Sequence, residues 1–183
     1  MKQKKLMGIV AILFLVAGML FLFNLDEDVE NIRNVSMEKV TSWKDVKLTD
    51  VRTGETFSIS EFSGKPVLVE SFAVWCPTCK EQQDEIRQLH NQVGDSIVSI
   101  SLDTDPNEDK RRVLEHLDRH GYSWRYAVAP DELTQTLISE FGLSVVNAPS
   151  APVVLVCEDQ ETRLLSTGVK SSQELQNEIN GGC

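Results

Sequence analysis

Residues 67–79, VLVESFAVWCPTC, constrain the fold of this chain more than any other segment. The first eight of them are apolar apart from Glu70 and Ser71, which is typical of a central strand that is buried on both faces. After the cysteines, apolar residues recur at helical spacing and charged residues occupy the positions between them. The segment therefore predicts a buried strand that leads directly into a helix, with Cys76 and Cys79 in the first turn of that helix.

The remaining sequence alternates between strand and helix patterns. Alternating residues at 46–50 and 57–59, separated by a turn at 52–55, predict a leading β-hairpin. Further strands are expected at 97–102, 124–128, 153–156 and 162–166, with helices that end near residues 120, 141 and 179. This order predicts an α/β domain whose mixed central sheet is flanked by helices.

The N-terminal residues predict a membrane anchor. Residues 6–23 are uncharged and mostly apolar, which suits a helix that needs roughly 20 residues to cross a bilayer. A cleaved signal peptide is the alternative, but its apolar region spans about 7–15 residues and ends at a small-residue cleavage site, which is not evident here. Lysines before the run and acids after it predict a cytoplasmic N-terminus, with the rest of the chain on the outer side of the cell membrane. We expect residues 1–25 to form the cytoplasmic tip and transmembrane signal anchor, 26–42 a tether, and 43–183 the folded domain.

The charge balance argues against two classes of partner. The chain carries 28 acidic and 18 basic residues, and several of the lysines precede the apolar run. Surfaces that bind nucleic acid or anionic lipid need clustered lysine and arginine, so neither partner is expected. A domain of this length can bury a core unaided, and cysteines outside the cytoplasm can form disulfides. At least one of the two possible cysteine pairs is therefore free to serve chemistry.

Cys76 and Cys79 have the spacing that disulfide exchange requires. At a helix N-terminus, unpaired backbone N–H groups and the positive end of the helix dipole favour the thiolate of Cys76 over its thiol. The thiolate is the nucleophile in disulfide exchange. Cys79 lies one turn further on, close enough to attack a mixed disulfide at Cys76 and release the product. The local sequence thus supplies a nucleophile and a resolving thiol.

The motif FAVWCPTC resembles the WCxxC active site of the thioredoxin superfamily. Residues 45–180 are similar to its membrane-tethered TlpA/ResA branch in the leading hairpin, the GKPVLVxxFAxWCxxC pattern, the DxD before a helix, and a proline that opens the penultimate strand. The resemblance implies a thioredoxin-like fold with an N-terminal β-hairpin and a βα insertion. It implies thiol–disulfide oxidoreductase activity with no cofactor or metal. The implied partners are protein thiols and disulfides and a membrane or exocytoplasmic redox partner.

The resemblance also implies further site residues. Glu70 lies six residues before Cys76, where thioredoxins place a buried acid, and burial raises the pKa of such a carboxyl so that it can move the proton of the second cysteine. The family's cis-proline leaves the backbone before it free to pair with a substrate chain. We expect it at Pro152, which leads directly into residues 153–156, with Pro149 as the alternative. The residues expected to form the substrate-binding face are Trp75, Pro77, Thr78, Ala151 and Pro152.

Pro77 and Thr78 leave the direction of electron flow open. Thioredoxin-like reductases commonly place proline just before the second cysteine, whereas here the proline follows the first. The intervening dipeptide tunes the stability of the thiolate and hence the redox potential. These two residues do not fix whether the protein reduces or oxidises its substrates.

Two other uses of the cysteine pair are possible in principle. A peroxidase of the peroxiredoxin type resembles PxxxTxxC, but Val69 and Ala73 occupy the proline and threonine positions. A copper-binding metallochaperone that uses Cys76, Cys79 and a remote ligand is the alternative function. It differs from the main interpretation because it predicts tight copper binding by the reduced protein.

The remaining polar motifs predict ordinary structural roles. His116 and His120 lie four residues apart, which is at most half of a zinc site, and we expect both to be solvent-exposed. The acids at 103–109 imitate a calcium loop, but Glu108 occupies the position that requires glycine, so helix capping is the better interpretation.

The other two cysteines are isolated in the sequence. Cys157 ends an apolar strand and is expected to be a small buried hydrophobe. Cys183 follows two glycines, and three states stay open for it: a free thiol, a disulfide with Cys157, or a disulfide between two chains.

Overall fold

Residues 42–182 are the part of the chain that the computed structural model describes. The signal anchor predicted at residues 1–25 and nearly all of the predicted tether lie outside the described residues, as does Cys183. Within residues 42–182, no helix has the length and apolar character to span a membrane.

Five strands form the central sheet in the order β5-β4-β3-β6-β7. β3 runs parallel to β4 and antiparallel to β6, β5 runs parallel to β4, and β7 runs antiparallel to β6. The strand bounds are β3 Val67–Phe72, β4 Val98–Asp103, β5 Arg125–Val128, β6 Val153–Val156 and β7 Thr162–Leu164. The mixed sheet confirms the predicted α/β class.

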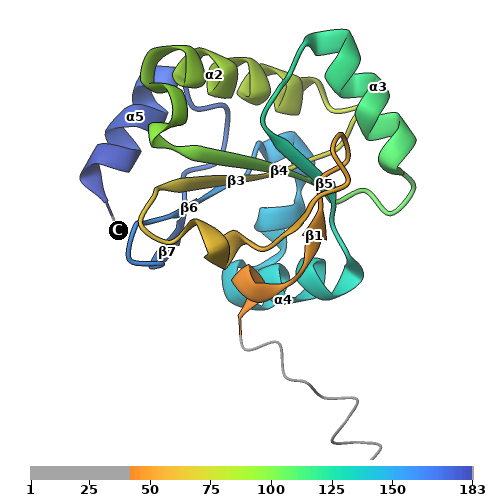
Figure 1. The fold of residues 1–183 in the computed structure, drawn as a ribbon, viewed down its shortest axis with the longest axis horizontal. Helices are drawn as coiled ribbons and strands as arrows, with labels where there is room; N and C mark the ends of the chain where they lie inside the picture. The colour runs from red at the N-terminus through yellow and green to blue at the C-terminus, as the bar shows by residue number, and fades with distance from the viewer. Residues whose placement is uncertain (1–41, 183) are drawn as a thin grey trace, which may run out of the picture. The chain divides into compact units, whose positions relative to one another are not determined.

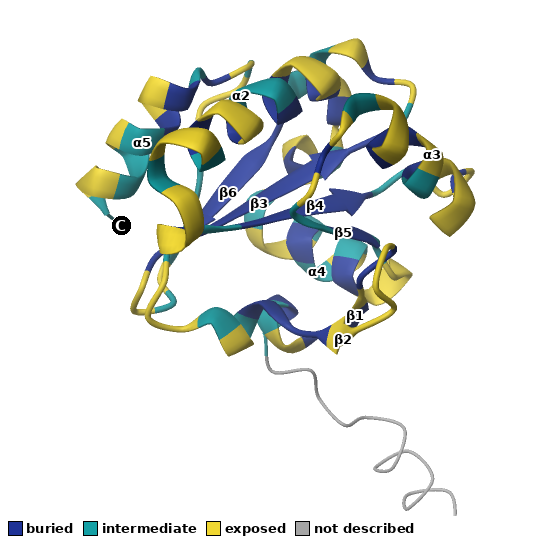
Figure 2. Cartoon of the chain, turned by 45° about the horizontal axis from the view of Figure 1, so that its top comes forward, coloured by how far each residue is buried: buried dark blue, intermediate teal, exposed yellow. Residues whose placement is uncertain are grey.

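Helices cover both faces of this sheet, with α2, α3 and α5 on one face and α4 on the other (Figure 1). Their bounds are α2 Pro77–Val93, α3 Lys110–His120, α4 Asp131–Phe141 and α5 Ser172–Gly181. Figure 2 shows that the central strands β3, β4 and β6 are buried while the helices expose their outer surfaces. Short 3₁₀ helices lie at η1 Trp43–Asp45, η2 Ile59–Phe62, η3 Gly94–Ser96, η4 Leu143–Val146 and η5 Ala148–Ser150.

The central strand and the helix after it form as the sequence predicts. All six residues of β3 are buried, because helices pack on both faces of the sheet. Pro77 is the first residue of α2, where proline loses no helical hydrogen bond and its fixed φ suits the helix. The helix ends at Gly94, whose φ of 59° is accessible to glycine at little cost.

The predicted leading hairpin is also present. β1 (Leu48–Thr49) pairs antiparallel with β2 (Thr56–Phe57). The Asp50 carboxylate accepts hydrogen bonds from the backbone N–H groups of Arg52 and Thr53, at 2.9 and 2.8 Å, so an aspartate side chain organises the turn. The N–H of Val51 donates to the carbonyl of Tyr126 in β5, which attaches the hairpin to the domain.

Candidate active site

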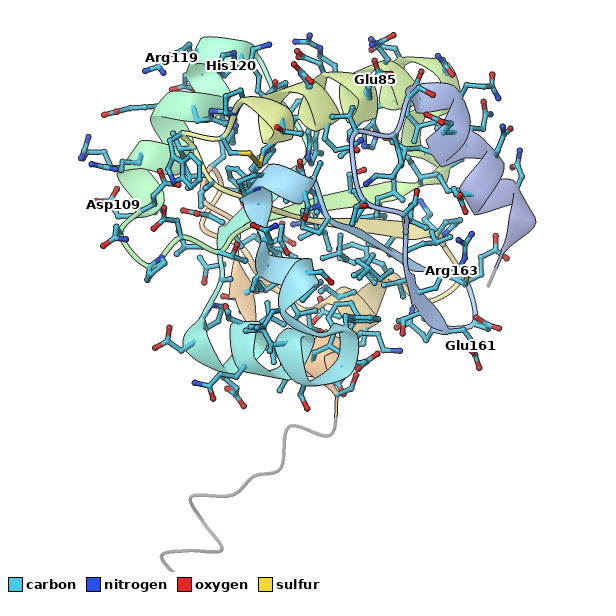
Figure 3. All side chains as sticks on the ribbon, turned by 180° about the vertical axis from the view of Figure 1, so that it is seen from behind. Glu85, Asp109, Arg119, His120, Glu161 and Arg163 are labelled. Carbon is cyan, nitrogen blue, oxygen red and sulfur yellow. A yellow bond between two sulfur atoms is a disulfide. The ribbon has the colours of Figure 1, made fainter. Side chains whose placement is uncertain are left out.

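Cys76 and Cys79 are joined by a disulfide, with their Cα atoms 5.3 Å apart. Cys76 is the N-cap of α2, and its sulfur accepts a hydrogen bond of 3.1 Å from the backbone N–H of Cys79. Figure 3 shows this disulfide as a yellow bond at the start of that helix. In the reduced state the same N–H and the helix dipole stabilise a thiolate at Cys76. The strand-to-helix junction thus places Cys76 at a helix N-terminus, as the sequence predicts, and its role as the nucleophile stays a prediction.

The two sulfurs differ in their surroundings. Cys79 is completely buried, and its sulfur lies 3.2 Å from the carbonyl oxygen of Ala148 in η5. Cys76 is flanked by the exposed side chains of Trp75 and Pro77, and Trp75 is 59% exposed. Cys76 is itself only 2% exposed, but both of its neighbours lie at the surface, whereas Cys79 contacts the interior at Ala148.

A cleft of about 310 Å³ opens beside Trp75. One wall comes from the segment before Cys76 and from the loop after β4, and the other from η4 and η5. The lining residues are Ala73, Trp75, Thr104, Asp105, Pro106, Val146, Asn147, Ala148 and Pro149. Asp105 is the one charged residue among them, so the cleft is mainly apolar.

Ala151 and Pro152 do not line this cleft. Both are buried, and the carbonyl of Pro152 accepts a hydrogen bond from the N–H of Ser71 in the neighbouring strand β3. None of the described residues follows a cis peptide bond, so the cis-proline expected at Pro152 is not found there. The η5 helix places the Ala148 carbonyl against Cys79 and Pro149 in the wall of the cleft, whereas Ala151 and Pro152 directly precede β6. The role of the latter pair in substrate binding stays a prediction, and Ala148 and Pro149 have the better position for it.

Glu70 is completely buried in β3. Its Oε2 accepts hydrogen bonds from Ser101 Oγ at 2.7 Å and from Gln83 Nε2 at 3.2 Å, whereas its Oε1 has no partner. Burial raises the pKa of this carboxyl to about 8, against the opposing effect of the two donors and of the Lys170 ammonium. A carboxyl with this pKa can both take and give a proton near neutral pH. Its burial agrees with the expectation from the sequence, and its catalytic role stays a prediction.

His116 is buried and not solvent-exposed as the sequence suggested. It is 3% exposed, and its Nε2 lies 2.7 Å from Oε1 of Gln83, the residue whose amide nitrogen binds Glu70. The ring also stacks on Phe72. Helical spacing alone did not reveal this position, because α3 packs its polar His116 against a buried glutamine. His120, one turn later, is only half-buried.

Lys170 is a buried cation that sequence reasoning missed. It is 4% exposed, and its Nζ donates to the carbonyls of Ala151 at 2.6 Å and Ser166 at 3.0 Å. Burial lowers the pKa of the ammonium to about 8, and the charge of Glu70 opposes this effect. Lysine is rarely buried without partners, and no sequence motif marks this one.

The acidic loop after β4 holds the segment that leads to Cys76. The N–H of Val74 donates to Glu108 Oε2 at 2.6 Å, and the indole Nε1 of Trp75 donates to Asp105 Oδ2 at 2.6 Å. Asp109 caps α3 by accepting a hydrogen bond from the N–H of Arg112, so the capping interpretation is correct for this residue. The contacts of Glu108 and Asp105 with the redox segment were not foreseen, since they join residues about thirty positions apart.

The described residues also bear on the copper alternative and on Cys157. Within residues 42–182, no three His, Cys, Asp or Glu side chains are arranged to hold a metal ion. A copper site at the cysteine pair therefore lacks a third ligand in this part of the chain. Cys157 is buried, as expected, but it is disulfide-bonded and so is more than a small hydrophobe.

A mixed sheet with a CxxC disulfide at the start of the helix that follows its central strand defines a thioredoxin-like redox domain. The chain belongs to the Redoxin family, whose model matches residues 38–177. This confirms the resemblance drawn from the sequence at the level of family and fold.

Individual relatives agree with this family. The chain is 24% identical over 127 residues to the thiol-disulfide oxidoreductase ResA of Halalkalibacterium halodurans, covering 67% of this chain and 65% of the relative. It is 31% identical over 122 residues to the thiol:disulfide interchange protein DsbE of Yersinia pestis, covering 64% and 62%. The matches thus span slightly less than two thirds of these relatives. A thiol:disulfide interchange protein of Chlorobium tepidum has the same fold, with a TM-score of 0.61 and 18% identity over 75% of this chain and 92% of that one.

Proposed function

We propose that this protein is a thiol–disulfide oxidoreductase that exchanges disulfides with exported proteins. The observation that carries the proposal is the Cys76–Cys79 disulfide, with Cys76 at the N-cap of α2 and next to Trp75, which lines an open cleft. The family and the names of the relatives support it. The geometry does not set the direction of electron flow, which depends on the redox potential of the pair.

The exchange proceeds in two displacements. In the reducing direction, the Cys76 thiolate attacks one sulfur of a substrate disulfide, forms a mixed disulfide, and releases the other substrate sulfur as a thiolate that takes a proton. Cys79 then loses its thiol proton, and its thiolate attacks the Cys76 sulfur, which releases the second substrate thiolate. Two electrons pass to the substrate and the Cys76–Cys79 disulfide forms. Glu70 is the group that takes the proton of Cys79, and the same steps in reverse oxidise a substrate dithiol.

The surface around the cleft supports a protein as substrate. The large apolar side chains that are exposed within residues 42–182 are Trp75, Leu143 and Val169. Trp75 lines the cleft, and Leu143 begins the η4 helix that also lines it. Val169 follows Gly168, whose N–H donates to Ser150 at the end of η5. An exposed tryptophan beside a mainly apolar cleft is typical of a surface that binds another protein.

We further propose that the domain is anchored in the cell membrane and works on its outer side. The apolar residues 6–23 and the lysines before them support this proposal. Reporter fusions test it: alkaline phosphatase attached after residue 42 should be active, because that enzyme requires export. An inactive phosphatase fusion together with a fluorescent cytoplasmic reporter at the same position contradicts the proposal.

Exchange assays test the enzymatic proposal directly. The wild-type protein should catalyse the reduction of insulin by dithiothreitol or the oxidation of a model dithiol, and Cys76→Ser should lose this activity. Cys79→Ser should accumulate a mixed disulfide with the substrate, visible as a mass increase that reductant removes. If Cys76→Ser keeps full exchange activity, the proposal is wrong.

A further inference from the structure

Three buried polar side chains connect helix α3 to the centre of the sheet. His116 Nε2 lies 2.7 Å from Gln83 Oε1, and Gln83 Nε2 lies 3.2 Å from Glu70 Oε2. Glu70 and Gln83 are completely buried, and His116 is 3% exposed. Buried polar groups are costly unless they are hydrogen-bonded, so this chain of contacts fixes three side chains at once.

The hydrogen-bonding capacities of the three side chains determine which atom donates in each of these hydrogen bonds. The Gln83 amide directs its nitrogen to the Glu70 carboxyl, so its oxygen must accept, and the Nε2 of His116 must carry the proton. Burial lowers the pKa of His116 to about 4, so the ring is neutral at pH 7 and carries a single N–H. That N–H holds Gln83 in the orientation that makes it a donor to Glu70.

These hydrogen bonds meet helix α2 one turn after the resolving cysteine. Gln83 lies one turn after Cys79 on α2, so both side chains point to the same side of the helix. Glu70 meets that side from β3, and Ser101 of β4 donates a second hydrogen bond to the same oxygen, Oε2. The two donors leave Oε1 as the oxygen without a partner. Oε1 is therefore the atom that is available to exchange a proton.

Other titratable groups interact electrostatically with Glu70 and His116. Those that interact electrostatically with Glu70 are Lys170 before α5, Tyr122 before β5 and Tyr126 in β5. Those that act on His116 are His120 and Arg119 of α3 and Lys80 of α2. None of them replaces the hydrogen bond from Gln83, because the described donors to the Glu70 carboxyl are Ser101 and Gln83.

We propose that Gln83 and His116 are positioning residues for the proton step at Cys79. His116 orients Gln83, and Gln83 holds Oε2 of Glu70 so that Oε1 is presented for proton exchange. This inference rests on the proposed function, because it assigns Glu70 to the deprotonation of the resolving thiol. Neither residue touches the reacting sulfurs, so both act through Glu70.

Titration of Glu70 in the full-length reduced protein tests the inference. Carbon-13 shifts of labelled glutamate side chains report its acid dissociation constant, and Glu70→Gln identifies the signal. In Gln83→Met the acid dissociation constant of Glu70 should fall about tenfold, because the carboxylate loses one of its hydrogen-bond donors. The carboxyl then keeps its proton to a higher pH. The pH at which exchange is half-maximal should rise in parallel. His116→Leu should give a smaller change in the same direction, whereas His116→Gln keeps an N–H donor and should behave like the wild type.

Val113→Ala is the matched control for loss of stability. Val113 is buried on α3 near His116 and is apolar, so its truncation weakens the helix packing but should leave the Glu70 constant unchanged. If Gln83→Met fails to fold, the two His116 variants carry the test. An unchanged constant in both His116→Leu and Gln83→Met, or a changed constant with an unchanged pH profile of exchange, overturns the inference. If the wild-type protein catalyses no exchange, the proposed function is wrong, and the inference that rests on it is wrong as well. The activity assay of the wild type distinguishes this outcome from a failure of the inference alone.

Discussion

The indole Nε1 of Trp75 donates a 2.6 Å hydrogen bond to the carboxylate of Asp105. Trp75 directly precedes the nucleophilic Cys76, and both partners of this bond line the cleft. An exposed tryptophan beside an active site can adopt several rotamers, and each rotamer gives the cleft a different shape. The carboxylate selects one of them, so a residue of the loop after β4 shapes the surface next to the cysteines.

Asp105→Ala should therefore weaken substrate binding more than it slows chemistry. Removing the acceptor lets the Trp75 ring reorient, and a lost charge-assisted hydrogen bond of about 1 kcal/mol corresponds to a roughly fivefold rise in KM. Steady-state kinetics with a protein substrate measure this. Asp118→Ala is the control, because Asp118 is an exposed carboxylate that pairs with Arg52 and does not line the cleft. A fall in kcat with an unchanged KM contradicts the prediction.

Glu70 should make the stability of the protein depend on pH. Its folded-state pKa of about 8 lies above the ordinary value of 4.5, so the folded state binds this proton more tightly than the unfolded state does. The free energy of unfolding therefore falls as the pH rises from about 4.5 to about 8. Glu70→Gln has no charge to bury. The unfolding free energy of this variant minus that of the wild type should therefore be larger at pH 9 than at pH 5, by up to roughly 4 kcal/mol.

Denaturant unfolding of both proteins at the two pH values measures this difference. Glu81→Gln is the control, because Glu81 is exposed on the same helix, α2. It should show the same pH dependence as the wild type. If the stability difference between Glu70→Gln and the wild type is the same at pH 5 and pH 9, the Glu70 carboxyl does not titrate as its burial predicts.

The parts of the site that are contiguous in the chain could be predicted from the sequence. The strand, the cysteine pair and the helix follow one another, so periodicity and spacing were enough to place Cys76 at a helix N-terminus. The burial of Glu70 was also expected, but from the resemblance to thioredoxins, which place a buried acid at this position of the strand. The fold class followed from the order of such local patterns.

The parts that tertiary packing creates could not be predicted. His116 and Lys170 are polar residues in ordinary polar surroundings of the sequence, and only the packing of α3 and of the loop before α5 buries them. The contacts of Asp105 and Glu108 with the segment before Cys76 also arise from tertiary packing. The motif comparison assigned these two residues to helix capping alone. The position of each proline relative to the cleft is also set by tertiary packing. Pro152 directly precedes β6, whereas the η5 helix carries Pro149 into the wall of the cleft.

Substitution of the two prolines should separate their roles. Pro149 is exposed and lines the cleft, so Pro149→Ala should raise KM for a protein substrate a few-fold with little loss of stability. Pro152 is buried where the chain enters β6, so Pro152→Ala should lower the unfolding free energy by about 1 kcal/mol and leave KM nearly unchanged. Kinetics and denaturant unfolding of both variants check this, and each serves as the control for the other. A larger KM effect at Pro152 restores the original assignment.

Lys170 should help Glu70 to ionise. Its ammonium lowers the pKa of the Glu70 carboxyl, so Lys170→Met should raise that pKa further and shift the pH profile of exchange to higher pH, with a several-fold lower rate at pH 7. The variant also leaves the carbonyls of Ala151 and Ser166 without the donor they share, which should lower the unfolding free energy by about 1–3 kcal/mol. The measurement is the pH dependence of the exchange rate at temperatures where both proteins are folded. Lys47→Met, which removes an exposed lysine paired with Glu61, should leave the profile in place. A profile that moves to lower pH in Lys170→Met contradicts the electrostatic role of this buried cation.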